Sequence, residues 1–284
     1  MFVIPFPTID PVLIEIGPID IRWYALAYIT GLVLGWRYMI RLARRQGTYF
    51  GKAPVTAPMI DDFFVWATIG VIVGGRLGFA LLYEPGYYLS NPLEIILGIR
   101  NGGMAFHGGL MGVVLAIILF SLKRGLHPFI LGDLVACAAP IGLFFGRIAN
   151  FINGELWGRP TDVPWAMVFP NAPGDLPRHP SQLYEAGLEG LILFVILLLL
   201  AYRSGAFKRP GILIGVFLIG YGIARFLVEF VRDFDPDWIY FGWLTLGQIY
   251  CLPMVAAGLW FIWRAYSKTP DEWAELQKPK PAKS

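Results

Sequence analysis

The sequence predicts an all-α protein: a polytopic membrane helix bundle with about seven transmembrane helices and a small outer cap. The chain of 284 residues is 56% hydrophobic and only 15% charged, whereas an ordinary soluble domain carries about 25% charged residues. Seven stretches are apolar over the roughly 20 residues that a helix needs to cross a bilayer. Lys and Arg gather in alternate connections between these stretches, as membrane-spanning helices require.

The seven predicted spans follow one another with short connections. They lie at residues 22–41, 60–82, 104–122, 130–148, 183–202, 211–232 and 246–264. The third and fourth are joined by a short turn, which makes them a tight antiparallel pair. Glycines four residues apart recur inside the spans, as at Gly74/Gly78 and Gly108/Gly112, and in lipid this spacing lets helix backbones approach closely.

We assign residues 1–266 to one membrane-embedded domain. It includes an outer cap loop at 149–182, which is rich in Pro, Asn and Gly; loops of this length in compact proteins are usually functional or disordered. Residues 267–284 are rich in Lys and Pro and are predicted to form a disordered cytoplasmic tail.

The distribution of positive charge predicts the orientation. Basic residues follow the first, third, fifth and seventh spans, whereas residues 83–103 hold only Arg100 and residues 233–245 hold none. The positive-inside rule therefore places the N-terminus outside and the C-terminus in the cytoplasm, a parity that seven crossings satisfy. The net charge of +3 is too modest to argue for nucleic acid, so we expect no nucleic-acid partner.

Metal and cofactor chemistry is not indicated. The two cysteines, Cys137 and Cys251, lie inside apolar runs, and the three histidines are far apart in sequence. No Cys/His spacing typical of a zinc site is present. We therefore predict no metal and no cofactor.

Arginines occur where charge is costly. Four lie within or at the ends of apolar spans, all in the predicted outer half: Arg76, Arg147, Arg225 and Arg232. A charge inside the membrane costs about 2.5–3.5 kcal/mol even on mild insertion scales, and such residues commonly mark functional sites.

The sixth span carries a polar stripe. Tyr221, Arg225, Glu229 and Arg232 fall within about 80° of one another on a helical wheel. One interpretation is a structural ion pair between Arg225 and Glu229, which are four residues apart. The interpretation we favour is an inward-facing site for an anionic ligand, because the planar guanidinium group can donate two hydrogen bonds to one phosphate.

His107 opens the third span on the outer side, in the run Phe106-His107-Gly108-Gly109. A lone histidine is more often structural than catalytic, but this one lies at the depth of the arginines. A histidine that titrates near neutrality can take a proton from a thiol or a hydroxyl.

A signature follows the fourth span. Residues 146–158 read Gly-Arg-Ile-Ala-Asn-Phe-Ile-Asn-Gly-Glu-Leu-Trp-Gly. This segment resembles the pattern G-R-x-G/A-N-F-aliphatic-N-x-E-x-x-G of the phosphatidylglycerol–prolipoprotein diacylglyceryl transferases, and it fills every fixed position. Four further blocks are similar to that family: Arg22-Trp23-Tyr24, residues 106–110, residues 178–185, and Gly220-Tyr221-Gly222 with Arg225 and Glu229. The departures are loop lengths and the Lys/Pro-rich tail.

The resemblance implies a reaction. Members of the family move an sn-1,2-diacylglyceryl group from phosphatidylglycerol to the thiol of the lipobox cysteine that follows the signal peptide of a prolipoprotein. A thioether forms and glycerol-1-phosphate leaves, as the first step of lipoprotein maturation at the outer face of the cell inner (cytoplasmic) membrane. The implied partners are phosphatidylglycerol, the prolipoprotein signal peptide with its lipobox, and the lipid bilayer.

Roles for the residues follow from that reaction. The departing phosphate gains negative charge, so fixed guanidinium groups stabilise the transition state more than the ground state; Arg147 and Arg225 are the candidates. His107 is the candidate base for a thiol with a pKa of about 8.5, although which residue takes the proton stays open. Glu155 is expected just past a helix end, where it orients an arginine. Tyr24 is expected to provide a neutral hydroxyl group as a hydrogen-bond donor at the same depth in the membrane.

The residues expected to bind phosphatidylglycerol lie on two helices. Asn150 is about one turn from Arg147 on roughly the same helix face and is placed to hydrogen-bond the headgroup. The expected set is Arg147, Asn150, Tyr221, Arg225 and Glu229. Acyl-chain preference, oligomeric state and the lateral routes of entry and exit stay open.

Two other classes of function are disfavoured. A transporter for an organic anion needs polar groups along a path through both membrane halves, and here the inner halves are nearly featureless, with Asp61, Asp62 and Asp133 marking helix starts. A seven-helix receptor of the retinal type needs a lysine in its last span, which is absent from residues 246–264. Such a receptor also has no need for the outer arginines.

Overall fold

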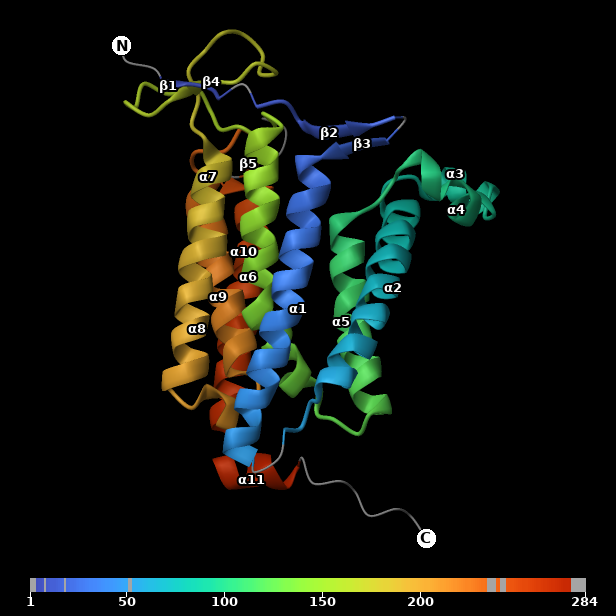
Figure 1. The fold of residues 1–284 in the computed structure, drawn as a ribbon, viewed down its shortest axis with the longest axis vertical. Helices are drawn as coiled ribbons and strands as arrows, with labels where there is room; N and C mark the ends of the chain where they lie inside the picture. Colours follow the sequence, from blue (N-terminus) through green and yellow to red (C-terminus); the bar gives the residue numbers. More distant parts are fainter. Residues whose placement is uncertain are drawn as a thin grey trace. The chain divides into compact units, whose positions relative to one another are not determined.

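The computed structural model describes residues 4–7, 9–17, 19–50, 53–233, 239–240 and 244–276 (Figure 1). The chain divides into two compact units. Unit 1 comprises Met1–Leu42 and Asp133–Pro270, and unit 2 comprises Ala43–Gly132 and Asp271–Ser284.

Each predicted span is helical in the structure. The long helices are α1 (Trp23–Phe50), α2 (Ala57–Leu82), α5 (Phe106–Lys123), α6 (Pro128–Ile152), the continuous run of α7 (Ser181–Glu185), η2 (Ala186–Ile192) and α8 (Leu193–Arg203), α9 (Ile212–Val228) and α10 (Leu246–Tyr266). Among the described residues, five helices are long and apolar enough to cross a membrane, namely α2, α5, α6, Ser181–Arg203 and α10, and α9 is a shorter apolar helix. The chain is therefore a multi-pass helical membrane protein, as predicted.

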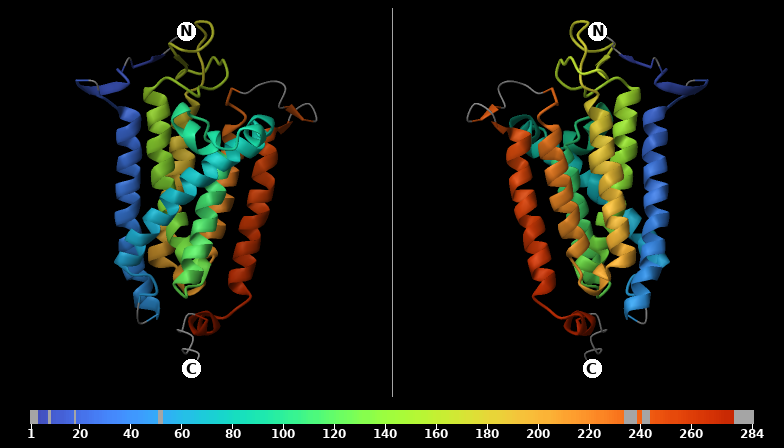
Figure 2. Two further views of the ribbon diagram at one scale, coloured as in Figure 1. Left: turned by 90° about the vertical axis from the view of Figure 1, so that its right-hand side faces the viewer. Right: turned by 90° about the vertical axis from the view of Figure 1, so that its left-hand side faces the viewer.

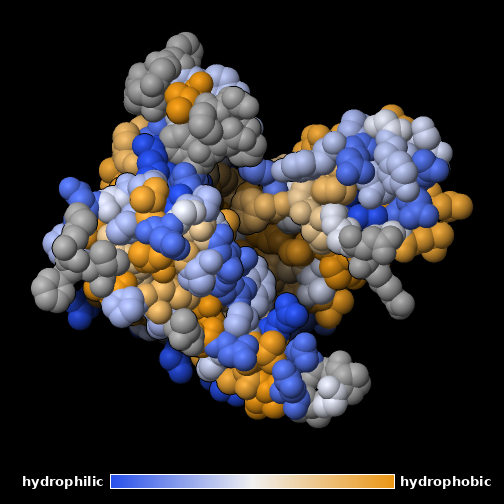
Figure 3. Space-filling model, turned by 90° about the horizontal axis from the view of Figure 1, so that it is seen from above, coloured by the Kyte–Doolittle hydropathy of each residue, from blue (hydrophilic) through white to orange (hydrophobic). Residues whose placement is uncertain are grey.

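Short elements connect the long helices. They are α3 (Pro85–Ser90), α4 (Glu94–Leu97), η1 (Gly98–Asn101), η3 (Ala206–Lys208) and α11 (Pro270–Glu275). Three two-stranded sheets pair β1 (Ile4–Pro5) with β4 (Met167–Val168), β2 (Val12–Ile16) with β3 (Ile19–Arg22), and β5 (Ile239–Tyr240) with β6 (Leu244–Thr245). Seen from the end at which β1 to β4 lie, hydrophilic and hydrophobic residues are interspersed (Figure 3).

Unit 2 is built on the pairing of α2 with α5. A Cβ atom at Gly74 would overlap the Gly108 carbonyl oxygen, and one at Gly112 would overlap the Gly70 carbonyl oxygen. The backbones of the two helices therefore touch, which confirms the close approach predicted from the glycine spacing. Most of the exposed positions of α2 are apolar, for example Val65, as suits contact with lipid.

Arg76 is a structural residue of unit 2. It is 4% exposed, and it donates hydrogen bonds to the carbonyl oxygens of Glu94 (2.7 Å), Ile95 (2.8 Å) and Gly102 (2.7 Å). Its guanidinium group also lies over the Tyr88 ring. Arg76 therefore satisfies the backbone of the connection that follows α2, which explains its charge without a ligand.

Unit 1 contains α8, α9 and α10, and α9 packs against α10 (Figure 2). A Cβ atom at Gly215 would lie 2.7 Å from the Gly258 carbonyl oxygen, so these backbones also meet at glycines. The first turn of α9 is held by Asp133 of α6, whose carboxylate accepts hydrogen bonds from the backbone N–H groups of Gly211 and Ile214, both at 2.9 Å. Asp133 thus caps a neighbouring helix rather than its own.

The predicted sixth span, 211–232, is longer than the helix. α9 ends at Val228. The residues that follow are held outside the helix by the loop after α6: the Arg159 N–H donates to the Val231 carbonyl oxygen at 2.9 Å, and Gly158 forms an antiparallel bridge with Arg232. Tertiary contacts therefore accompany the end of the helix four residues before the predicted boundary.

The predicted cap loop, 149–182, is joined by the N-terminal segment. β1 runs parallel to β4, and the Phe6 ring lies 5.3 Å from the Phe151 ring and 5.1 Å from the Phe169 ring. Within the loop, Arg178 donates to the Gly158 carbonyl oxygen at 3.2 Å, and it also donates to Asp233, which follows α9, at 2.7 Å. The loop is thus held by aromatic packing and an ion pair.

The predicted disorder of residues 267–284 does not hold for residues 270–275, which form α11. Trp273 is fully buried and packs edge-on against His127, with ring centroids 5.3 Å apart. Lys52 and the tail residues Lys278, Lys280 and Lys283 lie outside the described residues.

Candidate functional site

A cluster of charged residues lies inside unit 1, where α6, α7 and the end of α9 meet. Its centre is Glu185, the last residue of α7, whose side chain is 1% exposed. The Glu185 carboxylate forms an ion pair with Arg147 Nε at 2.5 Å, and it accepts hydrogen bonds from Arg232 Nη1 at 3.2 Å and from Arg225 Nη1 at 3.4 Å. Arginines from α6, from α9 and from the segment that follows α9 are therefore tied to one carboxylate.

Two further glutamates flank Glu185. Arg225 Nη2 lies 2.8 Å from Glu229, and Arg147 Nη2 lies 3.6 Å from Glu189. Glu229 also accepts a hydrogen bond from the Thr245 hydroxyl at 3.0 Å. We call these six residues the arginine–glutamate cluster: Arg147, Arg225, Arg232, Glu185, Glu189 and Glu229.

The acidic and the basic side chains of the cluster differ in their exposure. The glutamate side chains of the cluster are 0–6% exposed, whereas the three arginine side chains are 18–19% exposed. Each guanidinium group has five N–H donors in a planar fork, more than the contacts to the glutamates use. The glutamates are thus almost fully buried, and the arginines are the more accessible charges of the cluster.

Local structure explains how Glu189 reaches Arg147. The turn from Ala186 to Ile192 is π-helical, a wide turn that is frequent at functional sites. A Cβ atom at Gly190 would lie 2.7 Å from Phe144 Cβ, so only glycine lets this turn lie directly against α6. Glu189 is consequently brought beside Arg147, which is one turn beyond Phe144 on α6.

The signature loop is fixed by side-chain amides. Asn150 Nδ2 donates to the Glu155 carboxylate at 2.8 Å, and Gln182 Nε2 donates to the Glu155 carbonyl oxygen at 2.5 Å. Leu156 adopts a φ of 59°, a left-handed conformation that is strained for a leucine. The Ser181 hydroxyl donates to the Leu156 carbonyl oxygen at 2.9 Å, which helps to hold this conformation.

Glu155 lies past the end of α6, as predicted, but its role differs from the expected one. Within the described part of the chain, its carboxylate accepts from Asn150 and Asn153 rather than from an arginine. Glu185 and Glu189 hold Arg147 instead.

Both candidate tyrosines belong to unit 1. The Tyr221 hydroxyl interacts with Arg147, Arg225 and Glu189, so Tyr221 lies at the cluster. The Tyr24 hydroxyl lies 3.2 Å from that of Tyr28 and also interacts with Asn150. Tyr24, Tyr28 and Arg22 line a hollow of about 360 Å³ at the start of α1.

The structure therefore brings Arg147, Arg225, Glu229 and Tyr221 together, with Tyr24, Asn150 and Glu155 at the adjoining loop. His107 lies in unit 2, in the first turn of α5, where its exposed ring is 5.7 Å from the Phe106 ring.

Several residues of the site were missed by the sequence analysis. Glu185 appeared only inside a resembling block, and Glu189 not at all, although both are carboxylates inside an apolar span. The same cost of intramembrane charge that singled out the arginines applies to them. In the cap loop, His179 Nδ1 lies 3.2 Å from the Tyr184 hydroxyl, and partial burial together with the nearby Arg159 lowers the pKa of His179.

Comparison with known proteins agrees with the signature. Residues 11–264 match the family model described as prolipoprotein diacylglyceryl transferase. Three similar curated proteins bear the name phosphatidylglycerol–prolipoprotein diacylglyceryl transferase. The one from Methylocella silvestris is 55% identical over 94% of this chain and 97% of that protein; the one from Rhodospirillum centenum is 55% identical over 92% and 94%. The one from Azospirillum brasilense is 54% identical over 93% of this chain and 97% of that protein.

The match covers most of the chain, including the helices that carry the cluster and the loop that carries the signature. This chain belongs to the prolipoprotein diacylglyceryl transferase family.

Proposed function

We propose that this chain is an enzyme that transfers an sn-1,2-diacylglyceryl group from phosphatidylglycerol to the lipobox cysteine thiol of a prolipoprotein. The observation that carries the proposal is the arginine–glutamate cluster, in which three partly open guanidinium groups are fixed on buried carboxylates. Family membership supports the same reaction. It is the first step of lipoprotein maturation.

The chemistry needs fixed positive charge. The cysteine sulfur attacks the glyceryl carbon that carries the phosphate ester, so a C–S bond forms as the C–O bond breaks. The electron pair of the broken bond leaves with glycerol-1-phosphate, and the thiol proton passes to a base. Because the departing phosphate gains negative charge, donors already in place stabilise the transition state more than the bound lipid.

We assign the phosphate contacts to Arg147 and Arg225. Their guanidinium groups come from different helices, α6 and α9, and are held by the same carboxylate, Glu185. Preorganisation of this kind means that little reorganisation accompanies the growth of charge. Tyr221 is a neutral hydroxyl donor to the same headgroup, and Glu229 orients Arg225.

The outer loop and the start of α1 complete the proposed lipid site. Asn150 contacts the headgroup and is positioned by Glu155. Tyr24 lines the hollow beside this loop, which offers room for a lipid glycerol or a peptide backbone. His107 is the proposed base for the lipobox thiol, because histidine can exchange a proton near neutral pH.

The proposed setting is the cell inner membrane, with the N-terminus outside, the C-terminus in the cytoplasm and the cluster in the outer half. Both substrates are anchored in lipid, so they reach the site sideways from the bilayer. Transfer is proposed to require no metal, no cofactor and no nucleic acid.

The test is direct assay of transfer. The purified protein is incubated with phosphatidylglycerol and a lipobox peptide, and the thioether product and glycerol-1-phosphate are measured by mass spectrometry. We expect both products in equal amounts, and none with a peptide whose lipobox cysteine is replaced by serine. Failure to form thioether with a folded protein and phosphatidylglycerol in excess would reject the proposed function.

A further inference from the structure

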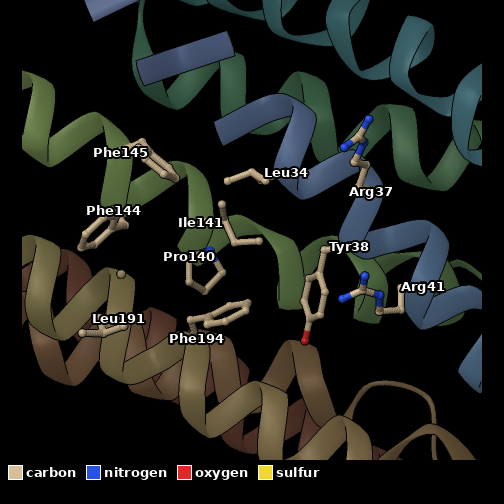
Figure 4. Close-up of a pocket in the computed structure, with 11 residues that line it drawn as sticks. Leu34, Arg37, Tyr38, Arg41, Pro140, Ile141, Phe144, Phe145, Leu191 and Phe194 are labelled. Carbon is tan, nitrogen blue, oxygen red and sulfur yellow. The ribbon is translucent and has the colours of Figure 1, made fainter. Parts of the chain in front are cut away.

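A second cavity in unit 1 takes no part in the proposed reaction. Its volume is about 480 Å³, and it lies between α1, α6 and the helix that contains η2 and α8 (Figure 4). Its walls are largely apolar and are formed by Leu34, Ile141, Phe144, Phe145, Leu191 and Phe194.

One side of this cavity is basic. Arg37 and Arg41, one turn apart on α1, lie opposite Phe144 and Leu191 (Figure 4). Both arginines are exposed, and none of the ion pairs among the described residues involves either of them. Two neighbouring guanidinium groups beside an apolar groove are complementary to a phosphate attached to a hydrocarbon chain.

Tyr38 supplies an independent observation. Tyr38, which lies between Arg37 and Arg41 in the sequence, also lines the cavity. Its side chain is 8% exposed, and its hydroxyl has no hydrogen-bond partner among the described residues. A buried hydroxyl without a partner is unfavourable and calls for an explanation such as an absent ligand. An ester or phosphate oxygen of a lipid provides the missing partner.

We propose that this cavity binds one anionic phospholipid, with the phosphate on Arg37 and Arg41 and an acyl chain between α1, α6 and α8. The site is separate from the donor site, because neither arginine belongs to the arginine–glutamate cluster. Under the proposed orientation, Arg37 and Arg41 lie in the cytoplasmic half of α1, where anionic lipids attract basic residues.

The bound chain also has a place in the architecture of the enzyme. Phe144 and Gly190, which line the cavity, are the contact between α6 and η2 that brings Glu189 beside Arg147. A lipid chain in this cavity therefore packs against Phe144 and Gly190 and stabilises the contact between α6 and η2. Binding requires neither the peptide substrate nor transfer, so the inference can be tested apart from the proposed function.

The test counts bound lipids by native mass spectrometry. The full chain, purified in detergent, is titrated with phosphatidylserine or with phosphatidylcholine of identical acyl chains. The variants are R37Q/R41Q, which removes the basic side, and Leu34→Trp, which fills the groove. The matched controls are Arg44→Gln and Leu32→Trp, exposed positions on α1 that do not line the cavity.

We expect wild type to retain one phosphatidylserine that R37Q/R41Q binds about thirtyfold more weakly. Leu34→Trp should lose the same lipid, both controls should keep it, and phosphatidylcholine should bind weakly throughout. Equal phosphatidylserine binding by wild type, R37Q/R41Q and Leu34→Trp would overturn the proposal, as would equal binding of phosphatidylcholine by wild type. Displacement by millimolar inorganic phosphate would instead indicate a site for free phosphate and would also overturn it.

The two variants check each other. If one of them fails to fold, as judged by its elution and thermal unfolding in detergent, the other still decides the outcome, because R37Q/R41Q removes the charge whereas Leu34→Trp fills the apolar groove.

Discussion

Glu185 is the residue on which the geometry of the candidate site depends most. It is almost fully buried and is the shared acceptor of Arg147, Arg225 and Arg232. Buried ion pairs contribute little net stability when complete, but removing one partner leaves an uncompensated buried charge at a cost of about 3–5 kcal/mol. We therefore regard Glu185 as a positioning residue that acts through the arginines.

Replacing Glu185 with Gln should lower kcat of transfer by about tenfold or more, because the arginines lose the charge that fixes them before the phosphate arrives. The measurement is initial rate against phosphatidylglycerol concentration, with Glu84→Gln, at an exposed glutamate, as the control. An unchanged kcat in folded Glu185→Gln would show that the arginines do not need this anchor.

His107→Gln should lower the transfer rate in a pH-dependent way. A free thiol with a pKa of about 8.5 is mostly protonated at neutral pH and ionises unaided in mildly alkaline solution, so the loss should shrink as the pH rises. The measurement is the ratio of variant to wild-type rate between about pH 6.5 and 9. His127→Gln, in the connection between α5 and α6, is the control and should show no such trend; a flat ratio for His107→Gln would exclude it as the base.

The sequence was a better guide to which residues form the site than to which of them contact one another. The cost of a charge in the membrane pointed to Arg147 and Arg225, and helical spacing pointed to Glu229 and Tyr221. The same spacing also allowed the ion pair between Arg225 and Glu229, which the structure contains at 2.8 Å. Glu185 could not be assigned as the centre because its three arginines come from segments far apart in the sequence.

At the scale of elements, the glycine pattern was the most informative local signal. Spaced glycines predicted that α2 meets another helix closely, and the structure identifies α5 as its partner. The π-helical turn of η2 and the early end of α9 were not predictable, because both arise from contacts with other segments, at Phe144 and at Arg159.

The contact of α2 with α5 predicts a strong effect of a single methyl group. Gly74→Ala should lower stability by about 1–3 kcal/mol, the usual cost of overpacking, because its Cβ has no room beside the Gly108 carbonyl oxygen. Thermal unfolding in detergent is the measurement. Gly142→Ala on α6, where a Cβ atom meets nothing within 4 Å, should be nearly neutral; equal unfolding temperatures for the two variants would contradict the packing described for unit 2.

At the scale of the whole molecule, the bilayer makes the sequence easy to interpret. Each span must satisfy its backbone internally and present apolar side chains to lipid, so hydropathy located all seven helices. The short strands and α11 were missed because they lie outside the spans and depend on particular contacts, such as Trp273 on His127. The assignment of each connection to the outer or the cytoplasmic face of the membrane is based on the uneven distribution of Lys and Arg.

That asymmetry predicts the topology. Fusions to a reporter that is active only in the cytoplasm should give signal after Ser284 and none after Thr245. The reason is that the predicted cytoplasmic connections hold many more Lys and Arg residues than the predicted outer ones. Protein levels measured by immunoblot serve as the control for expression. The reverse pattern would place the arginine–glutamate cluster in the wrong leaflet for the proposed reaction.

In the proposed reaction, Arg147 and Arg225 contact the headgroup phosphate as its charge grows. The most direct measurement is turnover of phosphatidylglycerol by Arg147→Ala, Arg147→Lys and Arg225→Ala, with folded yield measured in parallel and Arg203→Ala, at an exposed arginine, as the control. Each Ala variant should lose about a hundredfold, corresponding to about 3 kcal/mol for a lost charge contact in a low-dielectric site. Arg147→Lys should recover only part of the rate, since an ammonium group keeps the charge but not the two-pronged contact. Near-normal turnover in both Ala variants, with reduced folded yield, would show instead that these arginines are structural members of an ion-pair network.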